Sequence, residues 1–231
     1  MSTESPATKR RTTRQPLTRD RIVEAAIALV DEEGPDALTM RAVAERLGAG
    51  TMSLYRHVPG REELLDLVLA AMAAEVPVTP VTGDWRADLA AIARDVRVGL
   101  VRRPHLTVLL TSRAGRGLAE LPMLDRTLAV LRAAGFGRRG AVMANHALGN
   151  YVAGAALWEA VGLAGETGQA RAERRQAAAD AIARLPTGQF PSLDWVGPKL
   201  VAGTVDERFE AGLAFLLDGF EVSLARRKAG A

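Results

Sequence analysis

The segment from residue 39 to residue 58 has the apolar spacing of two short helices that meet at a glycine. Its first half carries apolar residues at positions i, i+3, i+4 and i+7, which share one face of a helix. These residues are Met40, Val43, Ala44 and Leu47. Gly48 follows, where a left-handed residue commonly ends a helix, and Leu54 and Val58 then resume the spacing. The pattern predicts a helix-turn-helix, an arrangement that places its second helix in the major groove of DNA.

The second of these helices indicates which side chains contact DNA. Its outward side carries small, donor, acceptor and aromatic groups, which suit base edges better than the Glu and Lys of a merely solvated helix. We predict DNA contacts from Thr51, Met52, Ser53, Tyr55 and His57. Arg56 faces outward with them. Two alternatives stay open, because Tyr55 could pack in the core and His57 could lie at this surface without a role.

The flanking segments complete a small helical domain. Residues 19–33 carry an apolar face and stop at Gly34, and Thr18 before them is a predicted N-cap. Leu38 and Thr39 repeat this opening at the next helix, with the spacing of a hydrophobic staple. A fourth helix begins at Arg61 with an acidic first turn, which suits the helix dipole.

Taken together, these residues resemble the DNA-binding domain of the TetR family of transcriptional regulators. The resemblance is carried by residues 22–30, Gly34 with residues 38–41, Ala44 with Leu47 and Gly48, and residues 53–58 followed by Arg61, Leu64 and Leu65. It implies a homodimer that holds two recognition helices, roughly 34–36 Å apart, against a palindromic operator in double-stranded DNA. It also implies that Arg41 and Arg61 contact phosphate, and that a small molecule on the C-terminal domain releases a repressor from DNA.

Composition permits this interpretation without requiring it. The chain has 231 residues and a formal net charge of +3, but basic residues are concentrated near its start. We predict that residues 1–16 form a flexible basic arm, which either contacts DNA or is only a solvated tail. The sequence has no cysteine, which excludes disulfides and thiolate metal sites and fits a reducing cytoplasm. No secretory signal precedes the domain, so we expect a cytoplasmic protein.

The remainder of the chain predicts a second, larger domain that is also all-α. Two prolines and a glycine in residues 77–83 indicate the boundary, so we expect a DNA-binding domain over 17–76 and a ligand-binding and dimerisation domain over 84–231. The apolar spacing predicts helices over 85–103, 105–111, 123–134, 141–163, 169–185 and 205–227. No alternating pattern predicts a sheet.

Residues 141–163 are apolar for long enough to suggest a membrane span. Asn145, His146, Asn150 and Glu159 argue against it, and we predict no membrane contact. Small residues along this segment instead favour close helix packing against residues 205–227 in a four-helix bundle of two subunits. The apolar stripe offered by that last helix is Phe209, Leu213, Leu216, Leu217, Phe220 and Leu224. The last helix also resembles the tetracycline-repressor type of C-terminal domain, although both helices could be ordinary monomer core.

The effector site is predicted from helices that could enclose an apolar cavity with a few polar groups. Its candidate residues are His105, Leu109, Leu110, Arg113, Met143, His146, Asn150 and Trp158. Tetracycline repressor chelates a drug-bound magnesium through a histidine and acidic residues, whereas Leu109 and Trp158 fall near those places here. We therefore expect a mainly apolar or aromatic effector and no metal or other cofactor.

Two other classes of function are a dinucleotide-dependent enzyme and a DNA-binding protein without an effector. Residues 135–140 match the GxGxxG of dinucleotide-binding enzymes, but the leucines before them are spaced as a helix rather than the required strand. No HExxH, GxSxG or phosphate-loop motif occurs, so we expect no enzyme. A DNA-binding protein without an effector remains the other alternative, and the length of the chain after Gly83 disfavours it.

Overall fold

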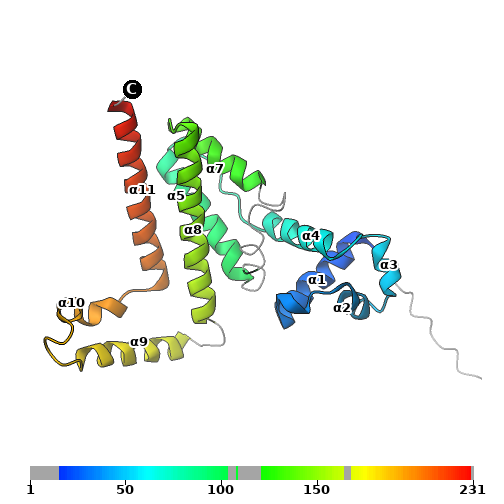
Figure 1. Ribbon diagram of the computed structural model, residues 1–231, viewed down its shortest axis with the longest axis horizontal. Helices are drawn as coiled ribbons and strands as arrows, with labels where there is room; N and C mark the ends of the chain where they lie inside the picture. The colour runs from blue at the N-terminus through cyan, green and yellow to red at the C-terminus, as the bar shows by residue number, and fades with distance from the viewer. Residues whose placement is uncertain (1–15, 104–107, 109–120, 164–167, 230–231) are drawn as a thin grey trace, which may run out of the picture. The chain divides into compact units, whose positions relative to one another are not determined.

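The computed structural model describes residues 16–103, 108, 121–163 and 168–229 (Figure 1). Every regular element in these residues is helical, which confirms the predicted all-α class. Contacts divide the chain into two compact units at the bond between Val68 and Leu69. The division falls inside a helix, whereas we predicted domain limits at 76 and 84, and those functional limits stay a prediction.

The first unit contains α1 (Arg19–Glu33), η1 (Pro35–Ala37), α2 (Met40–Arg46), α3 (Thr51–Tyr55) and the start of α4 (Arg61–Ala74). Both predicted N-caps are confirmed, because the hydroxyl of Thr18 accepts from the Arg21 N–H and that of Thr39 accepts from the Ala42 N–H. Gly48 has a φ of 59°, the left-handed conformation expected at the turn between α2 and α3. The core contains fully buried side chains from each α-helix of the unit, Ile22, Val43, Leu54 and Leu64 among them, and Val58 from the segment between α3 and α4.

Arginines tie the helices of this unit together. Arg46 at the end of α2 binds Glu32 of α1 through both carboxylate oxygens, and Arg19 of α1 pairs with Glu63 of α4. These pairs are partly exposed, so each contributes little to stability, but they fix the angles at which the short helices meet.

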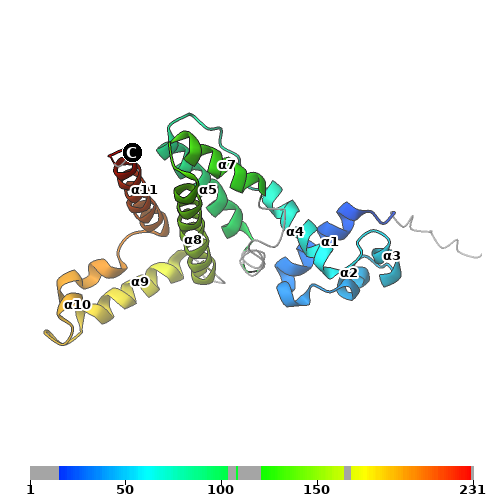
Figure 2. The ribbon, with the colours of Figure 1, turned by 45° about the horizontal axis from the view of Figure 1, so that its top comes forward.

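The second unit contains α5 (Trp85–Arg102), α7 (Leu121–Ala133), α8 (Arg138–Leu163), α9 (Gly168–Ala183), α10 (Pro191–Val196), η2 (Gly197–Val201) and α11 (Val205–Ala229). Figures 1 and 2 show α5 crossing α8, and α8 contacts α5, α7 and α11. Buried residues from these helices form the core, including Leu89, Leu131, Ala156, Leu213 and Leu217. Helix α9 packs on η2.

The segment before α5 is held by two buried carboxylates of that helix. Asp88 accepts from the Thr82 N–H (2.7 Å), the Thr82 hydroxyl (2.9 Å) and the Gly83 N–H (3.0 Å). Asp95 accepts from the N–H and hydroxyl of Thr79, at 2.8 and 2.9 Å. Burial pushes the pKa of Asp88 upward, but the hydrogen bonds from Thr82 and Gly83 outweigh it and leave the pKa below its ordinary value. Residues 77–83, which were predicted as a break between domains, are therefore ordered against α5, and we call this segment the strap.

Helix limits agree with the predictions to within three residues at each end in the described part of the chain. Helix α10 and η2 were missed, because the prolines and glycines around them leave no apolar period to recognise. The predicted helix over 105–111 lies largely outside the described residues. None of the described helices is both long enough and apolar enough to cross a membrane.

Candidate nucleic-acid interface and ligand pocket

Helix α3 exposes the side chains that we predicted to contact DNA. Leu54 and Val58 are fully buried and anchor the helix, so the remaining side chains must point outward. Met52 is 79% exposed, Tyr55 and His57 are exposed, and Thr51 and Ser53 are half-buried beside them. Tyr55 therefore does not pack in the core, and the five predicted contacts lie at the surface around α3, which we call the ridge of α3.

The prediction omitted Arg56, which belongs to the same ridge. Its guanidinium donates to the Ser53 hydroxyl at 3.1 Å and is otherwise exposed. This bond ties a positive charge to a residue predicted to contact DNA, and phosphate oxygens are its natural partner. The sequence placed Arg56 on the outward side, but only the structure shows that it lies against Ser53.

Arg61 and Arg41 are held in different ways. The Arg61 Nε donates to the Leu38 carbonyl at 2.9 Å, which links the start of α4 to the residue before the N-cap of α2. Arg41 forms an exposed pair with Glu45 of its own helix at 2.7 Å, and this hydrogen bond raises the pKa of Arg41. The bond to Leu38 fixes Arg61 beside the start of α2, and phosphate contact by either arginine stays a prediction.

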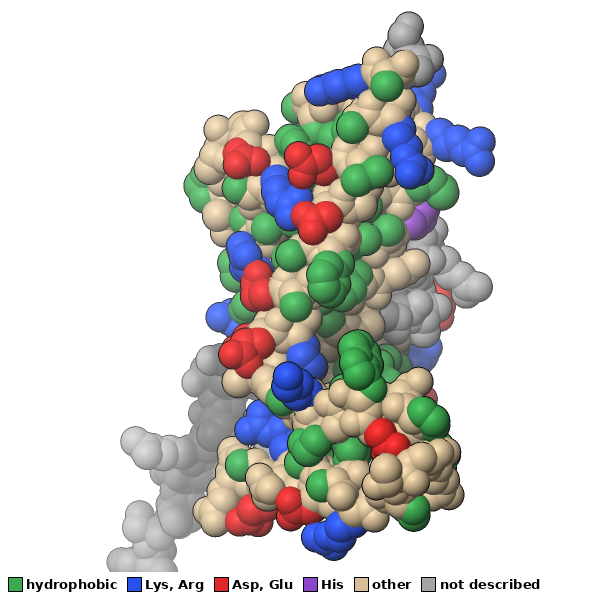
Figure 3. Space-filling view, turned by 90° about the vertical axis from the view of Figure 1, so that its left-hand side faces the viewer, with side chains coloured by type: hydrophobic (Ala, Val, Ile, Leu, Met, Phe, Trp, Pro, Cys, Tyr) green, Lys and Arg blue, Asp and Glu red, His purple; other side chains and the backbone are tan. Residues whose placement is uncertain are grey.

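Helices α8 and α11 carry apolar side chains on their outer faces (Figure 3). The largest are Met143, Leu157 and Trp158 on α8, and Phe215 and Val222 on α11. Five of the six residues of the predicted α11 stripe are buried within the subunit: Phe209, Leu213, Leu217, Phe220 and Leu224. Helix α11 thus contacts α8 as expected, and the pairing of both helices with those of a second subunit stays a prediction.

The predicted effector residues that the structure describes do not all lie in one place within a subunit. His105, Leu109, Leu110 and Arg113 lie outside the described residues. Met143, His146 and Asn150 are exposed along one side of α8, and Trp158 is 82% exposed near its end. Met143 and Trp158 are about 22 Å apart at 1.5 Å per residue, too far for one small ligand to reach both within the subunit.

Trp158 borders a pocket of about 390 Å³ at the start of α11. The other lining residues are Arg97, Tyr151, Ala155, Glu159, Val205, Arg208 and Phe209. Tyr151 and Phe209 stack with ring centroids 5.5 Å apart, and the Arg97 guanidinium lies 4.5 Å from the Phe209 centroid. Phe209 is itself buried, so the pocket offers mainly the exposed indole of Trp158 and the half-buried ring of Tyr151, which suits a mainly apolar ligand.

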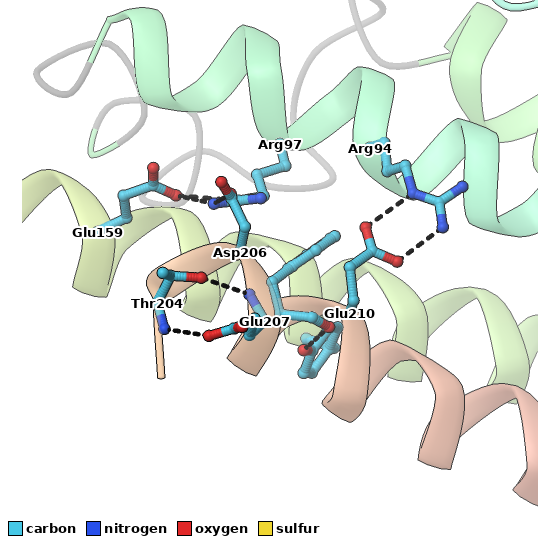
Figure 4. Close-up of polar contacts among 9 residues, drawn as sticks. Arg94, Arg97, Glu159, Thr204, Asp206, Glu207 and Glu210 are labelled. Carbon is cyan, nitrogen blue, oxygen red and sulfur yellow. Dashed lines mark hydrogen bonds and ion pairs between the residues drawn. The ribbon is translucent and has the colours of Figure 1, made fainter. Parts of the chain in front are cut away.

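Arginines of α5 hold α11 in place beside this pocket (Figure 4). Arg97 donates to Glu159 of α8 at 2.9 Å and to Asp206 of α11 at 2.6 Å. Arg94 binds Glu210 through two hydrogen bonds of 2.8 and 2.7 Å, which hold the pKa of Glu210 below its ordinary value. Thr204 and Glu207 close the first turn of α11 with reciprocal hydrogen bonds, a capping box.

Helices α8 and α11 approach closely at a glycine. The Tyr151 hydroxyl donates to the Phe209 carbonyl at 2.6 Å, and its ring lies over Gly212. A Cβ at position 212 would fall 2.9 Å from Tyr151 Cε2, nearer than carbon atoms pack. The contact therefore needs glycine at 212 for reasons of space.

The glycine-rich segment 135–140 joins α7 to α8 and follows a helix rather than a strand. Its glycines serve the turn, with Gly135 at a φ of 99°. The helix expected before it is confirmed, so the dinucleotide-binding motif lacks the preceding strand that it requires. Among the described residues, no group of three acidic or histidine side chains is placed to hold a metal ion.

Comparison with known proteins finds a matching family model for each part of the chain. Residues 22–68 match the model "Bacterial regulatory proteins, tetR family", and residues 76–224 match "Tetracyclin repressor-like, C-terminal domain". The HTH-type transcriptional repressor DrrR1 of Streptomyces coeruleorubidus is 37% identical over 96% of this chain and 84% of that protein. The class A tetracycline repressor from transposon 1721 of Escherichia coli is 33% identical, over 90% of each chain.

Solved structures give the same result. Apo ActR from Streptomyces coelicolor superposes with a TM-score of 0.78 and 30% identity, over 92% of this chain and 98% of that one. ActR in complex with actinorhodin superposes with a TM-score of 0.77 at the same identity, over 90% and 99%. With a helix-turn-helix unit, a helical second unit and relatives over nearly its whole length, the chain belongs to the TetR family of transcriptional regulators.

Proposed function

We propose that the protein is a repressor that binds a palindromic operator as a homodimer and leaves it when a mainly apolar or aromatic effector binds. The observation that carries the proposal is the exposed ridge of α3, whose anchors Leu54 and Val58 are fully buried. A helix fixed in this way can enter a major groove without rearranging its own subunit. The apolar outer faces of α8 and α11 support pairing with a second copy.

The DNA contacts in this proposal are the ridge residues, with the arginines on phosphate. They are Arg41, Thr51, Met52, Ser53, Tyr55, Arg56, His57 and Arg61. We place the protein in the cytoplasm and assign it no catalytic activity, since its relatives are transcriptional regulators.

Changing Ser53 or Tyr55 to alanine is expected to weaken operator binding about tenfold, because each change removes contacts worth roughly 1–2 kcal/mol from the groove. The wild-type protein would first select its site from a random double-stranded DNA library, and gel-shift titration would then compare the variants on that site. Ser223→Ala on α11 is the matched control and should bind as the wild type does.

Circular dichroism of the same samples separates lost contacts from lost folding. Both side chains are exposed or half-buried, so helicity should not change. Unchanged operator affinity in both variants would remove the ridge from the DNA interface, and failure of the wild type to enrich any sequence would contradict the regulator proposal.

For the effector, we propose that Trp158 supplies the aromatic contact, together with the other predicted residues: His105, Leu109, Leu110, Arg113, Met143, His146 and Asn150. Since Met143 and Trp158 lie about 22 Å apart along α8, one ligand can contact both only across a pair of subunits. ActR, a solved relative, has been crystallised with actinorhodin, which supports a ligand-responsive role here.

Changing Trp158 to alanine is expected to reduce effector affinity at least about tenfold while sparing operator binding in the absence of effector, because the exposed indole that borders the pocket is lost. Melting temperatures against a panel of aromatic compounds would identify a stabilising ligand. Trp195→Ala, an equally exposed tryptophan on α10, is the control. An unaltered dose response in Trp158→Ala would exclude this pocket, and a panel without any stabilising compound would favour a DNA-binding protein without an effector.

A further inference from the structure

A second cavity lies at the opposite end of α11 from Trp158. Its volume is about 650 Å³, within the range of small-molecule sites in proteins. Its walls come from the strap before α5, the start of α5, one side of α7 and the last turns of α11. It shares no lining residue with the pocket beside Trp158. The two cavities are therefore separate sites.

The body of this cavity is apolar and shaped by a fixed aromatic ring. Trp85 meets Phe136 edge-on at 6.4 Å between centroids, and Phe136 meets Phe220 in the same way at 6.0 Å. This chain of rings holds the indole in one orientation. Ala129 and Ala133 of α7 also line the cavity and add little side-chain bulk. The shape suits a flat apolar molecule.

The ionisable side chains that line the cavity differ in whether they have hydrogen-bond or ion-pair partners. Asp88 is satisfied by the strap, Glu221 lies 3.4 Å from Arg86, and Arg126 lies 3.6 Å from Asp95. Arg126 also donates to the Thr79 carbonyl. Lys228 has no acidic partner in the ranges that the structure describes, so one positive charge at the edge of the cavity is left uncompensated.

The surroundings of Lys228 strengthen this charge. Arg226 and Arg227 share its turn of α11, and Figure 3 shows Lys and Arg side chains gathered at this end of the unit. The helix dipole alone favours cations at a helix C-terminus. The dipole does not require that one of these cations border an apolar cavity. At such a place, one organic anion can contact the apolar lining and pair with the cation.

We propose that this cavity binds a flat amphipathic organic anion, with its apolar body against Trp85 and its anionic group on Lys228. The site is additional to the effector pocket and does not rest on the proposed effector. A bound molecule would bridge α7 and the last turns of α11, so it would also raise the melting temperature of the protein.

The test uses 8-anilinonaphthalene-1-sulfonate as the anionic probe and N-phenyl-1-naphthylamine, which has the same rings without the sulfonate, as its neutral counterpart. Trp158→Phe with Trp195→Phe leaves Trp85 as the only one of the three tryptophans. The anionic probe should then quench Trp85 emission in a saturable titration. The neutral probe should bind at least about fivefold more weakly, since it lacks a charge-assisted hydrogen bond.

Two substitutions locate the probe. Lys228→Ala should weaken the anionic probe about fivefold and leave the neutral probe unchanged. Ala133→Phe should abolish binding of both, and because Ala133 is exposed the larger side chain fills the cavity without entering the core. The matched controls are Lys199→Ala on η2 and Ala177→Phe on α9, both exposed and outside this cavity.

Each departure from this pattern overturns the proposal in a defined way. Unchanged affinity in Ala133→Phe would place the probe elsewhere, and equal affinities of the two probes would remove the anion requirement. Equal losses in Lys228→Ala and Lys199→Ala would reduce the effect to the general charge of the surface. Circular dichroism of each variant checks that the helical content is kept.

Discussion

Replacing Arg97 with methionine should lower the free energy of unfolding of the second unit by about 3 kcal/mol, because it leaves a buried carboxylate without its partner. The side chains of Arg97 and Glu159 are only 13% and 14% exposed, and the guanidinium also covers the Phe209 ring. Methionine fills a similar volume but supplies no charge. Denaturant unfolding followed by far-UV circular dichroism would measure the loss.

Arg94→Met is the matched control for this prediction. Its pair with Glu210 is about half exposed on both sides, so its loss should cost no more than about 1 kcal/mol. Adding Glu159→Met to Arg97→Met should recover most of the stability, since neither charge is then buried alone. Equal effects of the two arginine variants, or no recovery in the double variant, would show that burial of the Arg97 pair is unimportant.

Replacing Asp88 with alanine should destabilise the second unit by about 3 kcal/mol, because the N–H groups of Thr82 and Gly83 lose a buried acceptor. The strap should then detach from α5 and expose Leu89 and its neighbours. Asp84→Ala removes only the N-cap of the same helix and should cost about 1 kcal/mol. Hydrogen exchange of the strap amides would show detachment directly.

The effect of Asp88 should depend on pH in a defined direction. Its folded-state pKa lies below the ordinary value of 3.8, so ionised Asp88 contributes stability that is fully present above that value. The contribution is lost as the pH falls through the folded-state pKa. The stability difference between wild type and Asp88→Ala should therefore be large near neutral pH and shrink below about pH 4. A difference that stayed constant into acid would assign the effect to packing instead.

The first unit was predictable in detail because its signals are local. Thr18 and Thr39 each cap the helix that follows within three residues, and Gly48 ends α2 through its own backbone conformation. Such features depend on neighbours along the chain and need no knowledge of the fold. The exposed ridge of α3 followed in turn, because Leu54 and Val58 had to face inward.

The second unit was predictable only as a set of helices. Arg94 and Glu210 are 116 residues apart, and the sequence around either residue does not predict that they pair. The same holds for Asp88, which looks like a first-turn helix acid until the strap folds back onto it. The α11 stripe was recognised from its spacing, but a periodic pattern does not show how much of it is covered within one subunit and how much by a second.

The tight crossing at Gly212 couples two positions that are far apart in the chain. Because the Tyr151 ring occupies the space that a side chain at 212 would need, the two sites share one fixed volume. A larger residue at 212 is compatible with the same helix spacing only if residue 151 becomes smaller, and that exchange would also remove the bond to Phe209. The distance between α8 and α11 therefore depends jointly on the lack of a side chain at Gly212 and on the ring of Tyr151.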